Sequence, residues 1–226
     1  MMLITSIVNA QMYFGVTCDV GNRIDHQTDA SSTYFKRPIT LSGSLTIQMQ
    51  EEIHKNWFLR YGITAGVLGY NVKVFMPDTI SNSTSLEPYP FLDYTNIFTS
   101  LQFDLGRFFD LYERKFSWLI GGGISRYFNM FPDGVIGSVS VVNNNNSLSR
   151  IFYYEMYPAN KFSAFAEMTV QLELNQRFST GLSYRYHFKS ALKGSFEFDH
   201  VEKPSIGTLS VTHRTFSILL LVRMGK

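Results

Sequence analysis

Eight segments of the chain alternate apolar and polar residues with a period of two, and this pattern limits the possible folds more than any other feature. Residues that alternate in this way lie on opposite faces of a β-strand, whereas an amphipathic helix repeats every 3.6 residues. Most segments run for roughly ten residues, which is longer than the usual five or six of soluble sheets. They span residues 12–20, 41–50, 59–67, 97–106, 116–128, 162–174, 178–188 and 216–224.

The connections between these segments are alternately long and short. Short polar turns lie at 54–56, 113–115 and 175–176, whereas 22–38, 77–90, 132–160 and 191–207 are long and rich in Asn, Ser, Asp, Gly or Pro, as loops are. Short turns at one end and long loops at the other are typical of outer-membrane barrels. We therefore predict an all-β chain in which residues 11–226 form an eight-stranded antiparallel up-and-down transmembrane β-barrel, with both termini at the short-turn end.

Composition excludes several other classes of protein. The net charge is +2, with Lys+Arg 20 and Asp+Glu 18, so no excess of cations exists to neutralise nucleic-acid phosphates. No apolar run approaches the 18 or so residues that a membrane-spanning helix needs. A single Cys excludes a disulfide scaffold and a Cys-based zinc site.

Alternation alone does not say which face of the barrel is inside. A soluble lipocalin-like barrel has its apolar face inside, whereas a transmembrane barrel has it outside. The lysines fall in turns, loops and strand ends, with Lys73 the nearest exception, and the polar face is built mainly from Gly, Ser and Thr. Small polar residues suit a narrow lumen, and we therefore expect the apolar face to contact lipid.

The few charged residues in mid-strand share the polar face and have both signs. Charges enclosed in a lumen are expected to pair, because an unpaired buried charge is costly. The sequence predicts a lumen charge network of Asp19, Arg60, Asp104, Glu167, Glu173, Arg185, His187 and Arg223.

Aromatic residues gather towards both ends of the strands. Such bands are typical of the two interfaces between a membrane and water. We expect one girdle near the short turns and one near the long links, formed by Trp57, Phe58, Phe108, Phe109, Tyr112, Phe116, Trp118, Tyr127, Phe128, Tyr186 and Phe188.

The strand pattern resembles that of small outer-membrane barrels of the OmpA/OmpX type, and of outer-membrane β-barrel domains of Bacteroidota. The junction Asn9-Ala10-Gln11 is similar to a processing site, and residues 1–10 resemble the back half of a signal peptide, although an ordinary first strand is the alternative. The last strand departs from the pattern, because it ends without an aromatic residue. The resemblance implies the outer membrane of a Gram-negative bacterium, with lipid, lipopolysaccharide and other outer-membrane proteins as partners.

The sequence contains no recognisable catalytic, metal-binding or cofactor motif, and eight strands leave room only for their own side chains. We therefore expect a structural or interaction protein, either an accessory subunit of an outer-membrane assembly or an adhesion-type surface protein, without enzyme activity, metal or cofactor. One alternative is a lipid-modifying enzyme that uses His187 or His213 with a serine and a carboxylate. The other is a soluble lipocalin-like ligand binder.

Overall fold

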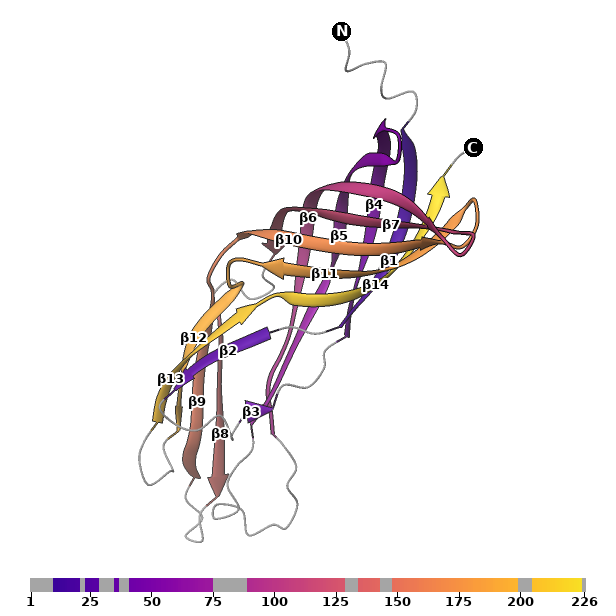
Figure 1. The fold of residues 1–226 in the computed structure, drawn as a ribbon. Helices are drawn as coiled ribbons and strands as arrows, with labels where there is room; N and C mark the ends of the chain where they lie inside the picture. The colour runs from indigo at the N-terminus through magenta and orange to yellow at the C-terminus, as the bar shows by residue number, and fades with distance from the viewer. Residues whose placement is uncertain are drawn as a thin grey trace.

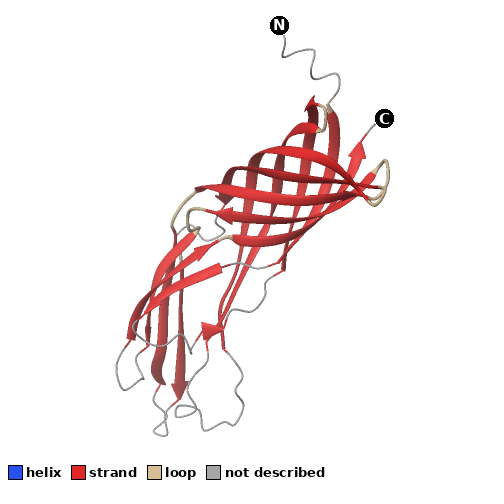
Figure 2. Ribbon diagram, in the orientation of Figure 1, coloured by secondary structure: helices blue, strands red, loops and turns tan. Residues whose placement is uncertain are grey.

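The computed structural model describes residues 10–20, 23–28, 35–36, 41–74, 89–128, 134–142, 148–198 and 205–224. The predicted signal-peptide remnant lies outside the described residues, apart from Ala10. Every regular element of the described part is a strand (Figure 2). The strands are β1 (Gln11–Val20), β2 (Arg23–Thr28), β3 (Phe35–Lys36), β4 (Leu41–His54), β5 (Trp57–Val74), β6 (Tyr89–Leu111), β7 (Arg114–Phe128), β8 (Val135–Val142), β9 (Leu148–Pro158), β10 (Phe162–Glu173), β11 (Phe178–His187), β12 (Leu192–Phe198), β13 (Ser205–Thr212) and β14 (Arg214–Met224).

Eight of these strands close into a barrel. The larger sheet has the order β3-β5-β4-β1-β14-β11-β10-β7-β6, and a further pairing of β5 with β6 closes the ring. The short strand β3 only extends the end of β5, through Phe35 and Lys36, and is not part of the ring. All the pairings are antiparallel, which confirms the predicted eight-stranded barrel (Figure 1). No helix of the described residues is long and apolar enough to cross a membrane.

The short turns and both ends of the barrel chain lie at one end of the ring. Met12 of β1 pairs with Met224 of β14, which places the start and the end of the barrel side by side. The turns between β4 and β5 and between β6 and β7 are tight, with positive φ at Lys55 (46°), Tyr112 (50°) and Glu113 (61°). Two-residue hairpin turns require this left-handed backbone, and it fixes the register of the hairpins.

A second sheet, which we call the outer sheet, stands at the opposite end of the barrel. Its order β2-β13-β12-β9-β8 follows that of the barrel strands β1-β14-β11-β10-β7, and each of its members directly precedes or follows the corresponding barrel strand in the sequence (Figure 1). The prediction that 132–160 and 191–207 are loops is therefore wrong for most of these residues. The two segments form hairpins because neighbouring barrel strands are already hydrogen-bonded where they leave the ring. The residues that follow can continue the same backbone pairing outside it.

Candidate functional site

The outer wall of the barrel is apolar, whereas the middle of its interior is polar. Side chains on the outward parity of the barrel strands are large, apolar and mostly about half exposed, including Met12, Val16, Ile47, Ile63, Leu101, Phe103, Ile124, Met168, Leu182 and Ile218. A soluble lipocalin-like barrel requires the reverse arrangement, so that alternative is wrong. A closed barrel satisfies all its backbone hydrogen bonds in lipid, and an apolar band around it is the arrangement of outer-membrane barrels. The chain is therefore a barrel of the outer membrane.

Along the nearly continuous strand β13–β14, the outward and inward faces exchange their polarity. The outward residues of β14 are Phe216, Ile218 and Leu220, which are 45–66% exposed. Further out, the outward positions change to Thr208, Ser210 and Arg214, with Ile206 as the exception, whereas Thr212 at the junction is buried. The inward residues change in the opposite sense, from Thr215 and Ser217 in the barrel to the buried Leu209 and Val211 in the outer sheet.

The same exchange occurs on the neighbouring strands of the outer sheet. Leu192, Phe196 and Met156 face inward with no more than 2% exposure, whereas Lys193 and Ser195 face outward and are exposed. Apolar side chains that turn inward indicate water on the outside. The exchange therefore marks the membrane boundary between Arg214 and Phe216, and the outer sheet stands beyond the bilayer. Because long links of outer-membrane barrels face the exterior, we assign this side to the outside of the cell.

Aromatic and aliphatic side chains fill the short-turn end of the lumen. Phe58, Phe108 and Leu119 form a cluster in which none is more than 8% exposed, and Leu221 packs with Tyr13 nearby. Phe58 and Phe108 were expected in a girdle, and this prediction is wrong. Their even positions share the inward parity of their strands, and Gly106 leaves the room that the Phe58 ring occupies.

Arg60 lies above this cluster and spans the lumen. Its Nη1 donates to Gln171 Oε1 and its Nη2 to Gln50 Oε1, both at 2.7 Å, so it joins β5 to β10 and β4. The guanidinium also lies over the rings of Tyr13 (5.6 Å) and Phe58 (5.4 Å). Two hydrogen bonds and two rings hold this buried cation across the lumen near the short-turn end.

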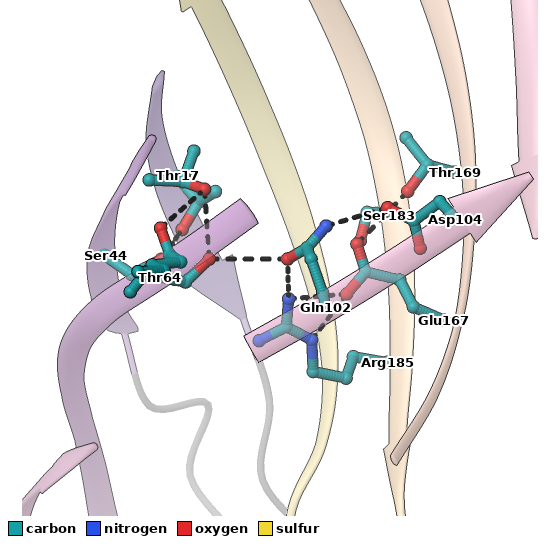
Figure 3. A network of polar contacts seen from close by, with 11 residues as sticks. Thr17, Ser44, Thr64, Gln102, Asp104, Glu167, Thr169, Ser183 and Arg185 are labelled. Atoms are coloured by element: carbon teal, nitrogen blue, oxygen red, sulfur yellow. Dashed lines mark hydrogen bonds and ion pairs between the residues drawn. The ribbon is translucent and has the colours of Figure 1, made fainter. Parts of the chain in front are cut away.

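A polar network fills the middle of the lumen (Figure 3). Arg185 donates from Nε to Glu167 Oε2 at 2.5 Å and from Nη2 to Gln102 Oε1 at 3.2 Å. Gln102 in turn donates to Asp104 Oδ2 at 2.9 Å, and Thr64 donates to Gln102 Oε1 at 3.3 Å. A cavity of about 30 Å³ beside this network has room for roughly one or two water molecules. The lumen is therefore packed with side chains and leaves no solute-sized passage among the described residues.

The structure brings together only part of the predicted charge network. Glu167 and Arg185 form the ion pair, with Asp104 joined through Gln102, whereas Asp19 is buried on β1. Glu173 lies at the short-turn end of β10, where it pairs with Lys115 at 3.8 Å. Arg223 is half-buried near the same end and does not belong to the network. Strand parity gave the inward direction of these residues but not their depth, which decides which of them meet.

The two candidate histidines lie inside the wall at the level of the boundary. His187 Nδ1 is 2.8 Å from the Tyr127 hydroxyl, and the His187 and His213 rings are 5.5 Å apart. Both histidines are buried, with 3% and 0% exposure. Tyr127 was expected in a girdle and that prediction is wrong, because it is on the inward parity of β7 and is 3% exposed. A lipid outside the wall does not reach this cluster.

The remaining girdle residues face outward or lie in a turn. Near the short turns, Trp57 and Trp118 meet edge to face at 5.6 Å, Phe109 and Phe116 stack at 5.7 Å, and Tyr112 is exposed in its turn. Near the membrane boundary, Phe128, Tyr186 and Phe188 lie on the outer wall. Sequence reasoning missed Phe162 and Phe216, which are exposed beside them.

The outward face of the outer sheet carries an exposed carboxylate between two tyrosines. Tyr153, Glu155 and Tyr157 alternate along β9, and both hydroxyls donate to the Glu155 carboxylate, the Tyr157 one at 2.8 Å. These hydrogen bonds lower the pKa of Glu155, and the carboxylate raises the pKa of Tyr157. Among the described residues, no group of three or more His, Cys, Asp or Glu side chains is placed to hold a metal ion.

Comparisons with known proteins give only distant similarities. No family model matches the sequence, and no curated protein matches it. Among solved structures, the outer membrane protein OprG of Pseudomonas aeruginosa is similar over 96% of both chains, with 11% identity and a TM-score of 0.46. Ail of Yersinia pestis covers 91% of this chain and 99% of its own, with 13% identity and a TM-score of 0.40. Neisserial surface protein A covers 96% and 99%, with 11% identity and a TM-score of 0.39.

Proposed function

We propose that the protein is an outer-membrane anchor that presents the outer sheet as an interaction surface. The observation that carries this proposal is the exchange of polarity along β13–β14. Strands that continue the barrel wall form a five-stranded sheet, and the exchange places this sheet outside the membrane. The position of the outer sheet relative to the barrel is fixed, because its strands continue the barrel strands and are not connected to them only by long loops. Its outward face, which is polar apart from the exposed Ile136, Tyr157 and Ile206, is suited to a partner that also remains in water.

The filled lumen supports a binding role over transport. A channel needs a continuous passage, whereas Phe58, Phe108 and Arg60 occupy the section nearest the short turns. We expect the barrel in a planar lipid bilayer to show no step conductance. Steady single-channel currents would contradict the proposal.

The partner belongs to one of two settings. As an accessory subunit, the barrel serves an assembly in its own outer membrane; as an adhesion-type protein, it serves a partner outside the cell. We also propose that the protein is related to barrels of the OmpA/OmpX type and of Bacteroidota. This relationship is compatible with either an accessory subunit or an adhesion-type protein.

A photo-crosslinking amino acid at Ser195, on the outward face of β12, tests the proposal in intact cells. A discrete crosslinked product from Ser195, absent with the same group at the lipid-facing Ile218, is the expected result. A product formed by cells alone would indicate an assembly in the same envelope, and one formed only with added target cells would indicate adhesion. No product in either condition would overturn the proposal.

The proposal assigns no catalysis to the buried histidines. We expect His187→Ala and His213→Ala cells to contain the same lipid A species as wild type by mass spectrometry. A species that changes in either variant would favour the lipid-modifying alternative.

A further inference from the structure

Five cationic side chains lie close together on one side of the barrel at the membrane boundary. We call Arg126, Lys161, Lys189, Lys193 and Arg214 the cationic collar. Four of these side chains are exposed and Arg214 is half-buried. None of the five is ion-paired within the part of the chain that the structure describes.

Backbone contacts place the collar on adjacent strands. Arg126 pairs with Phe162, next to Lys161, and Tyr127 N donates to Lys161 O at 2.8 Å. Lys189 N donates to Ser163 Oγ at 3.1 Å, which brings β11 to the same level as β10. Arg214 pairs with Tyr186 on the other side of β11. Four neighbouring strands at about 4.8 Å spacing give the collar a width of roughly 15 Å.

Aromatic rings of the boundary hold the two arginines in place. The Arg126 guanidinium lies over Phe128 at 4.8 Å and over Phe162 at 5.8 Å, and that of Arg214 lies over Tyr186 at 4.5 Å. Arg214 also donates from Nη2 to the Tyr186 hydroxyl at 3.1 Å, so part of its N–H edge is already occupied. A guanidinium stacked on a ring, as that of Arg126 is, keeps its N–H edge available for two parallel hydrogen bonds to a phosphate. Arg126 is therefore pre-arranged for an anion at the level where lipid headgroups begin.

A hollow opens on the outer sheet next to the collar. It is lined by Lys193, Ser195, Asn160 and the exposed Tyr157. An aromatic ring with amide, hydroxyl and ammonium groups suits a polar ring such as a sugar. Glu155, the carboxylate on the same face of β9, is already bound by the hydroxyls of Tyr153 and Tyr157.

We propose that the collar and this hollow bind the phosphorylated sugar headgroup of a glycolipid in the outer leaflet. The position selects a lipid, because Phe162 and Phe188 on the apolar wall, 52% and 63% exposed, lie directly beside the collar cations. Within the barrel wall, the described outward positions 12–20, 41–49 and 59–69 on β1, β4 and β5 hold no Lys or Arg. The protein therefore holds the glycolipid beneath its own outer sheet.

A variant with four Gln substitutions tests the proposal: Arg126→Gln, Lys161→Gln, Lys189→Gln and Lys193→Gln. The control carries Gln at four cations near the short turns, which are Lys55, Arg107, Arg114 and Arg177. Each protein is reconstituted in nanodiscs of phosphatidylcholine with a bisphosphorylated lipid A. The barrel is then extracted in mild detergent, and the lipid A retained per barrel is measured by native mass spectrometry.

We expect wild type and control to retain lipid A equally, and the collar variant to lose at least about tenfold, since each cation near an anionic surface contributes roughly fivefold. Retention by wild type should also fall when the lipid is enzymatically dephosphorylated and when salt rises. Equal retention by the collar variant, an equal loss in the control, or undiminished retention of the dephosphorylated lipid would overturn the proposal. A folded-barrel gel shift shows that each variant is intact before it is compared.

Discussion

The Glu167–Arg185 pair and the Lys115–Glu173 pair offer a direct test of how the lumen stabilises the barrel. Both glutamates belong to β10 and share its inward parity, so Glu167→Ala and Glu173→Ala are matched substitutions. Glu167 accepts from Arg185 at 2.5 Å and from Ser183 at 3.2 Å, and the two charged side chains are 8% and 14% exposed.

Removing one partner of such a buried pair leaves an uncompensated charge and costs about 3–5 kcal/mol. The Lys115–Glu173 pair is longer, at 3.8 Å, and its side chains are 43% and 34% exposed. Exposed pairs of this kind contribute about 0–1 kcal/mol. Glu167→Ala should therefore reduce the free energy of unfolding by several times as much as Glu173→Ala.

Urea-induced unfolding from lipid vesicles measures both values, with the fluorescence of Trp57 and Trp118 as the signal. The double variant Glu167→Ala, Arg185→Ala should recover part of the loss, because it leaves no unpaired cation in the lumen. The reasoning is refuted if the two single variants differ by less than about 1 kcal/mol, or if the double variant is less stable by the sum of both single losses.

Three further substitutions follow from the packing. Gly106→Val should destabilise the barrel by about 1–3 kcal/mol through overpacking, because a Cβ there would lie 2.3 Å from the Phe58 ring; urea unfolding measures it. Leu101→Lys should cost about 2–4 kcal/mol in the same assay, since this residue faces lipid in mid-strand. Tyr157→Phe should raise the pKa of Glu155, followed by NMR, because a hydrogen bond that favours the carboxylate is lost. The stability that this lowered pKa contributes is present above the unfolded pKa and is lost as pH falls through the folded one.

Each of these substitutions has a control on the same structure. Gly69→Ala places a Cβ at 3.5 Å from Leu41 O, an ordinary contact, and should be nearly neutral. Ser195→Lys faces water on the outer sheet and should cost far less than Leu101→Lys. Tyr154→Phe, on the opposite face of β9 from Glu155, should leave the Glu155 pKa unchanged. A loss of stability in Gly69→Ala or Ser195→Lys as large as in the matching substitution would contradict the assigned packing and faces. A change in the Glu155 pKa in Tyr154→Phe would do the same for β9.

The barrel was predictable from the sequence because lipid imposes one rule on every strand. All eight segments keep apolar side chains on a single parity, as Phe216, Ile218 and Leu220 do on β14. Most of their limits are close to those of the strands, but β5 (Trp57–Val74) and β6 (Tyr89–Leu111) extend well beyond the predicted 59–67 and 97–106. Parity also places Phe58 and Trp57 on opposite faces of β5. The inward position of Phe58 could therefore have been predicted, but its aromatic side chain near a short turn led us to expect it in a girdle. The depth of each lumen residue depends on strand stagger, which the sequence of one strand does not contain.

The outer sheet was missed because its strands are short and follow the opposite rule. In β12, Leu192 and Phe196 alternate with Lys193 and Ser195, which is the strand signal at shorter length. A strand that leaves the membrane must turn its apolar side chains inward. Where a barrel strand continues into the outer sheet, the parity of the apolar residues therefore changes, and in the sequence this change resembles the end of a strand. The Asn- and Ser-rich composition of the links then favoured loops.

Cysteine scanning along β13–β14 tests the position of the membrane boundary most directly. In a Cys18→Ser background, which removes the only native thiol, single cysteines are placed at Thr208, Ser210, Ile218 and Leu220. A membrane-impermeant maleimide applied to intact cells should label Thr208→Cys and Ser210→Cys, and should label Ile218→Cys and Leu220→Cys only after detergent. Labelling of all four positions in intact cells, or of none, would contradict a barrel wall that changes from lipid to water between Arg214 and Phe216.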